Sequence, residues 1–102
     1  MLHFKEEYLK DIISGRKRIT IRYGRNYDVR PGNTVVLTVR GRPVARAKIT
    51  SVQAMKLRDL TERHVKMEGF RSLADLLQYL RRIYPRICLD SCVTVMEWEP
   101  LP

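Results

Sequence analysis

The sequence predicts an α+β fold, a small, curved and mostly antiparallel β-barrel with covering helices. First, three strand-like segments, at 18–23, 34–39 and 44–52, follow one another with no helix between them. Parallel βαβ units would need a helix between most strands. Second, two helical segments and one last strand follow these three. Third, the length of 102 residues predicts a single domain over 1–102.

The first element expected is an amphipathic helix over roughly 5–14. Phe4, Tyr8 and Ile12 recur there at helical spacing between charged residues. Gly15 stands at the position where a glycine ends a helix in the left-handed conformation. We therefore expect the strand over 18–23 to start directly after this turn.

That strand carries the period-2 pattern of a half-buried β-strand. Ile19 and Ile21 would enter the core, and the alternating residues are Arg18, Thr20 and Arg22. The polar face would present one hydroxyl between two guanidinium groups, which suits an anionic or highly polar ligand. Taken alone, the pattern also fits an exposed basic edge strand whose charges deter aggregation.

A β-branched run at 34–39 predicts the second strand, and Gly41 marks a tight turn into the return strand at 44–52. Small and apolar side chains alternate with polar ones along this return strand. Its two faces are therefore expected to hold Ala45, Ala47 and Ile49 on one side and Arg46, Lys48 and Thr50 on the other.

The second half of the chain begins with a helix that places Leu57, Leu60 and His64 on one face and ends at Gly69. Because His64 lies on the apolar face, we expect a hydrogen-bonded core histidine rather than a catalytic residue.

The next helix has a strong apolar stripe over 73–84. Ser72 and Asp75 resemble a capping box at its start, and Pro85 stops it. The final strand is expected over 92–99.

The net charge of +9 is concentrated in one third of the chain. Between residues 16 and 48 Asp28 is the only acid, and the remaining residues hold equal numbers of acids and bases. A segment of one sign implies a polyanionic partner, such as tRNA or single-stranded RNA, although charge alone favours nucleic acid only modestly. The candidate RNA-binding residues are Arg25, Arg40, Arg42, Arg46 and Lys48.

Other classes of protein are disfavoured by composition. No apolar run reaches the length of a membrane span, and residues 1–7 lack the apolar core of a signal peptide, so a cytoplasmic protein is expected. Cys88 and Cys92 form a poor zinc site and are expected to be core thiols, although a disulfide stays open. We expect neither a metal nor a cofactor, and the sequence leaves the oligomeric state open.

Two motifs carry a resemblance to a known family. The first is Gly-x-Lys-x-x-Thr-x-Arg, filled here by Gly15-Arg16-Lys17-Arg18-Ile19-Thr20-Ile21-Arg22. It resembles the ASCH family of small PUA-like β-barrel domains. The second combines Leu60-Thr61-Glu62, His64 and Glu68 with Ile83-Tyr84-Pro85. This block is similar to the small bacterial amidohydrolases that cleave N(4)-acetylcytidine.

The resemblance implies a catalytic set of Lys17, Thr20 and Glu68 and a modified nucleoside or nucleobase as substrate. Arg22 would then be a substrate-binding residue, and we add Arg18 and Tyr23 to it as candidates. An acidic residue followed by Gly-Phe is also common in other ASCH proteins, some of which are thought to bind RNA. The alternative is therefore an RNA-binding module without catalysis, and an RNA-cleaving activity ranks lower.

The chemistry sets one geometric condition. Thr20 can supply a nucleophilic hydroxyl, and Lys17 could take its proton only if the pKa of the lysine is lowered. Residues three apart on an ideal strand point to opposite faces, so Lys17 can converge with Thr20 only if it precedes the strand on a bend at Gly15. Otherwise Lys17 would be a solvated lysine near a helix C-terminus.

Overall fold

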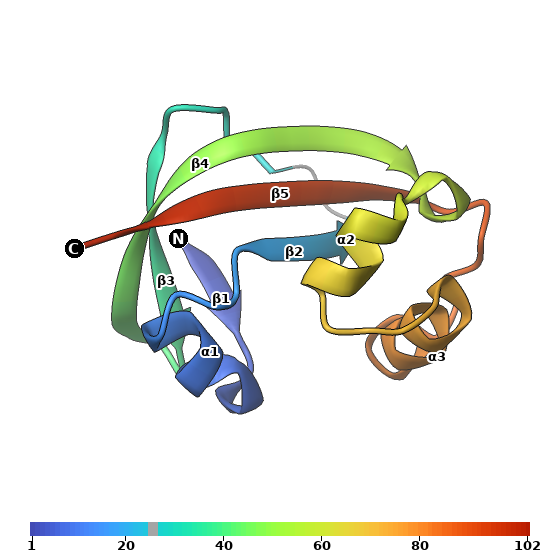
Figure 1. The fold of residues 1–102 in the computed structure, drawn as a ribbon, viewed down its shortest axis with the longest axis horizontal. Coiled ribbons are helices and arrows are strands. Elements are labelled where there is room, and N and C mark those ends of the chain that lie inside the picture. Colours follow the sequence, from blue (N-terminus) through green and yellow to red (C-terminus); the bar gives the residue numbers. More distant parts are fainter. Residues whose placement is uncertain (25–26) are drawn as a thin grey trace. The chain divides into compact units, whose positions relative to one another are not determined.

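The computed structural model describes residues 1–24 and 27–102, so Arg25, a predicted RNA-binding residue, lies outside the described residues. A short strand and a helical segment come first, three strands then follow one another, and two helices precede the last strand (Figure 1). The elements are β1 (Leu2–Phe4), the 3-10 turn η1 (Glu6–Tyr8), α1 (Leu9–Ile13), β2 (Ile19–Tyr23), β3 (Thr34–Val39), β4 (Arg42–Lys56), the 3-10 turn η2 (Leu57–Asp59), α2 (Glu62–Met67), α3 (Leu73–Ile83) and β5 (Cys92–Leu101).

The strands form a five-stranded mixed sheet in the order β1-β3-β4-β5-β2. β1 pairs parallel with β3, with Leu2 opposite Leu37, whereas β3 pairs antiparallel with β4, with Val35 opposite Ala47. The α+β class is confirmed. The parallel strand β1 was not predicted, because three residues are too few to show a period and Phe4 also fitted the helical spacing that follows.

The chain divides into two compact units. Unit 1 contains Met1–Arg18, Asp28–Val52 and Met96–Pro102, and unit 2 contains Ile19–Tyr27 and Gln53–Val95. β4 and β5 each run from one unit into the other. The single domain over 1–102 stays a prediction.

In unit 1 the predicted N-terminal helix is a 3-10 turn followed by α1, and it ends as predicted. Ser14 is the C-cap residue after Ile13, and Gly15 follows with φ 78°. A Cβ on Gly15 would lie 3.3 Å from Cγ of Pro100. The turn therefore needs a residue that tolerates the left-handed region and has no side chain. The buried apolar side chains of this unit are Leu2, Ile12, Val35, Leu37, Val39, Ala47, Ile49, Met96 and Trp98.

Unit 2 is built around one hydrophobic cluster that includes Ile19 and Ile21 of β2. The helix predicted around Leu57 is wrong at its start, because η2 is only a 3-10 turn and α2 begins after Thr61. The cause is a capping box. The Thr61 hydroxyl accepts from the backbone N–H of His64, and His64 Nδ1 accepts from the backbone N–H of Thr61.

The predicted start of α3 is confirmed. The Ser72 hydroxyl accepts a hydrogen bond from the backbone N–H of Asp75 at 3.1 Å. The helix ends at Ile83, two residues before Pro85, as expected from the missing N–H of proline.

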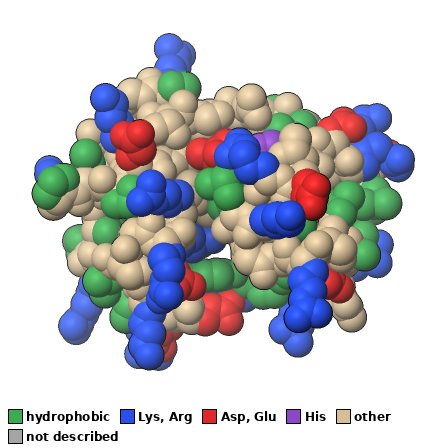
Figure 2. All heavy atoms as spheres, in the orientation of Figure 1, with side chains coloured by type: hydrophobic (Ala, Val, Ile, Leu, Met, Phe, Trp, Pro, Cys, Tyr) green, Lys and Arg blue, Asp and Glu red, His purple; other side chains and the backbone are tan. Residues whose placement is uncertain are grey.

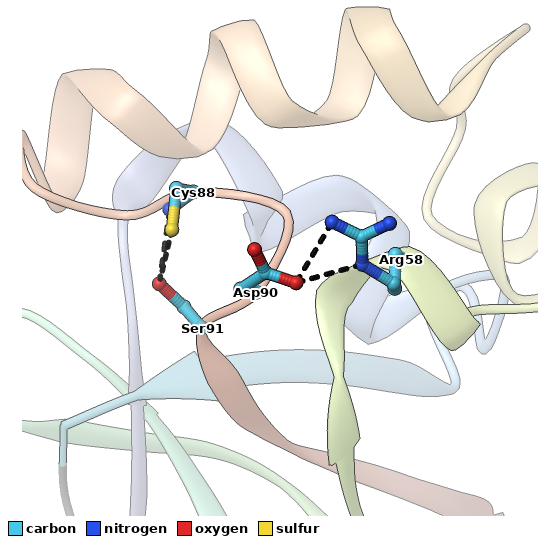
Figure 3. A network of polar contacts seen from close by, with 4 residues as sticks. All are labelled: Arg58, Cys88, Asp90 and Ser91. Atoms are coloured by element: carbon cyan, nitrogen blue, oxygen red, sulfur yellow. Dashed lines mark hydrogen bonds and ion pairs between the residues drawn. The ribbon is translucent and has the colours of Figure 1, made fainter.

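The prediction that Cys88 and Cys92 are core thiols is wrong, since both are free and exposed. Cys88 begins a turn in which its backbone N–H donates to Ser91 Oγ at 2.9 Å and its Sγ lies 3.5 Å from the same oxygen (Figure 3). This contact with the Ser91 hydroxyl, followed by the backbone N–H of Asp90, lowers the pKa of Cys88 below that of an ordinary thiol. The adjacent Asp90 carboxylate is paired with Arg58 at 2.7 Å.

Candidate functional site

The centre of the predicted site in unit 2 is a contact between Thr20 and Arg22 on β2. Thr20 is buried, with 5% of its surface exposed. Nε of Arg22 donates a hydrogen bond to Thr20 Oγ1 at 2.9 Å. The two residues are two apart on a strand and so share one face, as the sequence pattern predicts. The structure thus adds a hydrogen bond to the shared face that the sequence predicts for Thr20 and Arg22.

This contact has a chemical consequence. A guanidinium group that donates to a hydroxyl oxygen stabilises the negative charge that the oxygen acquires when it loses its proton. The effect is stronger at a buried site, where water screens the charges less. Arg22 also lies over the ring of Tyr27, with its guanidinium carbon 5.8 Å from the ring centroid. The arginine is thus oriented by a ring as well as by Thr20.

The other two predicted substrate-binding residues have different surroundings. Arg18 is exposed, and its Nε donates to the carbonyl oxygen of Gly15 at 2.8 Å. The ring of Tyr23 meets that of Tyr84 edge-on, with centroids 5.7 Å apart and an angle of 80°. Tyr23 thereby packs against the hydrophobic cluster of unit 2. Their roles in substrate binding stay predictions.

Glu68 lies at the C-terminal end of α2, where its side chain is partly buried. Its backbone N–H donates to the carbonyl oxygen of His64 at 3.1 Å, and Gly69 with φ 93° ends the helix. His64 itself is 4% exposed and bonded to Thr61, which confirms the predicted hydrogen-bonded core histidine.

Lys17, in unit 1, is buried with 8% of its surface exposed, so the solvated alternative is wrong. It precedes β2, which begins at Ile19, as the geometric condition required. Its Nζ lies 4.5 Å from the ring centroid of Tyr8 and 5.8 Å from that of Phe4. The sequence assigned both rings to helix packing and did not reveal this contact.

The predicted catalytic residues therefore divide between the two units. Unit 2 holds Thr20 and Glu68, together with Arg22, and unit 1 holds Lys17. Convergence of all three side chains stays a prediction. Within the described ranges, 1–24 and 27–102, no group of His, Cys, Asp or Glu side chains could hold a metal ion. In the same ranges no helix is long and apolar enough to cross a membrane.

Four of the five candidate RNA-binding residues are described, and all four are exposed. Arg40 pairs with Glu6 at 2.7 Å. Arg42, Arg46 and Lys48 follow one another along β4. Figure 2 shows Lys and Arg side chains projecting from the visible face. Arg46 also lines a hollow of about 420 Å³ in unit 1, with apolar side chains that include Val36 and Pro43.

This chain matches one family model and several relatives that share one name. The family model described as "ASCH domain" matches residues 1–97. A relative from Vibrio vulnificus (strain YJ016), named N(4)-acetylcytidine amidohydrolase, is 36% identical over 86 residues, which is 82% of this chain and 82% of the relative. A relative of the same name from Vibrio atlanticus is 36% identical over 98 residues, covering 94% of this chain and 90% of the relative.

Solved structures support the fold. An ASCH domain from Lactobacillus crispatus superposes with a TM-score of 0.72 at 20% identity, over 90% of this chain and 69% of that one. A protein from Pyrococcus furiosus superposes with a TM-score of 0.66 at 22% identity, over 98% of this chain and 94% of that one.

Proposed function

Since this chain belongs to the ASCH domain family, we propose that it is an amidohydrolase that cleaves N(4)-acetylcytidine or a related acylated nucleobase and releases acetate. The name of its relatives supports the substrate class. The observation that carries the chemistry is the partly buried hydrogen bond from Arg22 to Thr20. A guanidinium group that donates to the hydroxyl oxygen stabilises the deprotonated form of threonine, which is the nucleophile.

In the proposed reaction Thr20 Oγ forms a bond to the acetyl carbon while its proton passes to Glu68. The carbon–nitrogen bond then breaks, and Glu68 returns the proton to the leaving amino group of cytidine. Water then gives a proton to Glu68 as its oxygen bonds to the acetyl carbon, the bond from that carbon to Thr20 Oγ breaks, and the proton passes from Glu68 to Thr20 Oγ as acetate leaves. Lys17 supplies positive charge for the oxyanion that forms at each step, because ring faces favour the charged form of a lysine.

The test is to incubate the purified protein with N(4)-acetylcytidine and to follow cytidine by chromatography. Thr20→Ala, Glu68→Ala and Lys17→Ala should each lower the rate by about a hundredfold or more. Matched controls are Thr34→Ala and Glu62→Ala, which remove the same side chains at exposed positions and should leave the rate near wild type. No cytidine from the wild type, or full activity in all three variants, would reject the proposal.

A second candidate function is RNA binding by unit 1, favoured by the exposed cations Arg42, Arg46 and Lys48 along β4. Arg46 and Lys48 share one face of β4 and suit the phosphates of an extended polyanion, whereas Arg42 lies beyond a register shift in the pairing with β3. The apolar hollow beside Arg46 offers a surface for a base. The +9 charge exceeds what an uncharged nucleoside requires. The two functions are compatible, because an acetylated cytidine can also be part of an RNA chain.

This candidate predicts binding to tRNA that weakens steeply as salt is raised. Reversing the charges of Arg40, Arg42 and Arg46 to glutamate should abolish binding. The matched control reverses Lys56, Arg82 and Arg86, three exposed cations of unit 2, and changes the net charge equally. Equal losses of RNA affinity in both triple variants would show that net charge alone, and not the position of Arg40, Arg42 and Arg46, attracts RNA.

A further inference from the structure

The ammonium group of Lys17 lies over aromatic ring faces inside unit 1. Nζ is 4.5 Å from the centroid of Tyr8 and 5.8 Å from that of Phe4, both within the range of a cation–π interaction. Lys17 is only 8% exposed, so water contributes little to its solvation. A buried cation is costly unless other groups replace water around it, and the ring faces supply part of that replacement.

The backbone around Lys17 is held on both sides. Its own N–H donates to the carbonyl oxygen of Asp11 at 2.9 Å, and the carbonyl oxygen of Arg18 accepts from Trp98 N–H at 3.0 Å. The Cα of Lys17 is therefore fixed by unit 1 alone. What remains to be oriented is the flexible stem, which has four carbons and high rotamer entropy.

Tyr8 is better suited than Phe4 to orient this stem. Its ring is more than 1 Å closer to Nζ. It also ends η1, where its backbone N–H donates to the carbonyl oxygen of Lys5 at 3.0 Å. The ring of Phe4 also packs against Trp98, with the two centroids 5.8 Å apart. The ring of Tyr8 thus faces the ammonium group from a fixed position in the chain.

We infer that Tyr8 is a positioning residue for Lys17. The ring face of Tyr8 keeps the ammonium group of Lys17 in the orientation used in catalysis. The catalytic part of this inference rests on the proposed amidohydrolase function, whereas the orientation of Lys17 by the ring does not. Tyr8 acts through Lys17 and not on the substrate. Its loss should therefore lower kcat and leave KM nearly unchanged.

The first measurement is independent of activity. In the NMR spectrum of the wild type, the ε-methylene protons of Lys17 should be shifted upfield by the ring current of Tyr8. Tyr8→Phe keeps the ring and should keep the shift, whereas Tyr8→Leu should lose most of it. A wild-type Lys17 signal at the random-coil position would overturn the inference, whatever the variants do.

The second measurement is the kinetics of cytidine release. Tyr8→Leu should lower kcat about tenfold, the size expected for one desolvated cation–π contact, while Tyr8→Phe stays within about twofold. Phe4→Leu, at the larger distance, should have a smaller effect than Tyr8→Leu. An active wild type with an unchanged kcat in folded Tyr8→Leu would overturn the positioning role. A wild type without activity but with the upfield shift would refute the proposed function only.

Discussion

Local and distant partners hold different polar side chains in the two units. In unit 2 Thr20 bonds Arg22 two residues on and Cys88 contacts Ser91 three residues on, although Arg58 also reaches Asp90, 32 residues away. In unit 1 Lys17 and His3 have partners farther along the chain. Lys17 lies over Tyr8, and His3 Nδ1 is hydrogen-bonded to Thr38 Oγ1, 35 residues away. Local partners follow from the period of a strand or turn, whereas distant partners appear only when the chain is folded.

The largest effect is expected when a substitution removes the local contact between Thr20 and Arg22. Thr20→Val keeps the shape of the side chain and removes the hydroxyl, so the proposed nucleophile is lost and Nε of Arg22 loses its acceptor. The rate of cytidine release should fall by about a hundredfold or more, as for Thr20→Ala. Thr20→Ser, which keeps the hydroxyl, should recover much of the activity. Equal rates in the valine and serine variants would contradict a role for the hydroxyl.

The next effect concerns the turn that places Lys17 in unit 1. Gly15→Ala puts a Cβ at φ 78° and 3.3 Å from Pro100. Gly41→Ala is the matched control, because Gly41 has φ 75° but no atom within 4 Å of its Cβ position. The left-handed conformation should lower the free energy of unfolding by about 1–2 kcal/mol in both variants.

Gly15→Ala should be the less stable of the two variants, because only its new methyl group meets another side chain. Urea unfolding followed by the fluorescence of Trp98, the only tryptophan, measures the difference. If Gly41→Ala is as destabilised as Gly15→Ala, the contact with Pro100 does not contribute.

The smallest effect concerns the exposed local contact at Cys88. The Ser91 hydroxyl and the Asp90 backbone N–H lower the pKa of Cys88, so its thiolate forms at lower pH than that of an ordinary thiol. The pH midpoint of alkylation by iodoacetamide, followed by peptide mass spectrometry, should therefore lie below the usual thiol value. Ser91→Ala should move this midpoint upward. A midpoint that does not respond to Ser91→Ala would show that the hydroxyl has no part in the shift.

Much of the fold could be predicted from local sequence. The strand at 34–39, the helix after Ser72 and the left-handed Gly15 each follow from a pattern within a few residues, and all three are confirmed. The start of α2 was misplaced because the apolar spacing of Leu57 and Leu60 continues across the capping box at Thr61. The exposure of Cys88 depends on how the turn after α3 leaves the core, which no local pattern contains.

The candidate site was predicted in part for the same reason. The contact between Thr20 and Arg22 follows from strand alternation, and the position of Lys17 before β2 follows from the glycine turn. The ring of Tyr8 could not be assigned to Lys17, because its helical spacing with Phe4 and Ile12 already explained it. A contact between an aromatic ring and a side chain elsewhere in the chain can be assigned only once the fold is known.

A double-mutant cycle on cytidine release tests most directly whether Arg22 acts through Thr20. The variants are Thr20→Ala, Arg22→Leu and the two combined, each confirmed as folded. If Arg22 activates the hydroxyl, adding Arg22→Leu to Thr20→Ala should cause almost no further loss of kcat/KM. If the two losses multiply, Arg22 and Thr20 act independently, and activation of the Thr20 hydroxyl by Arg22 is contradicted.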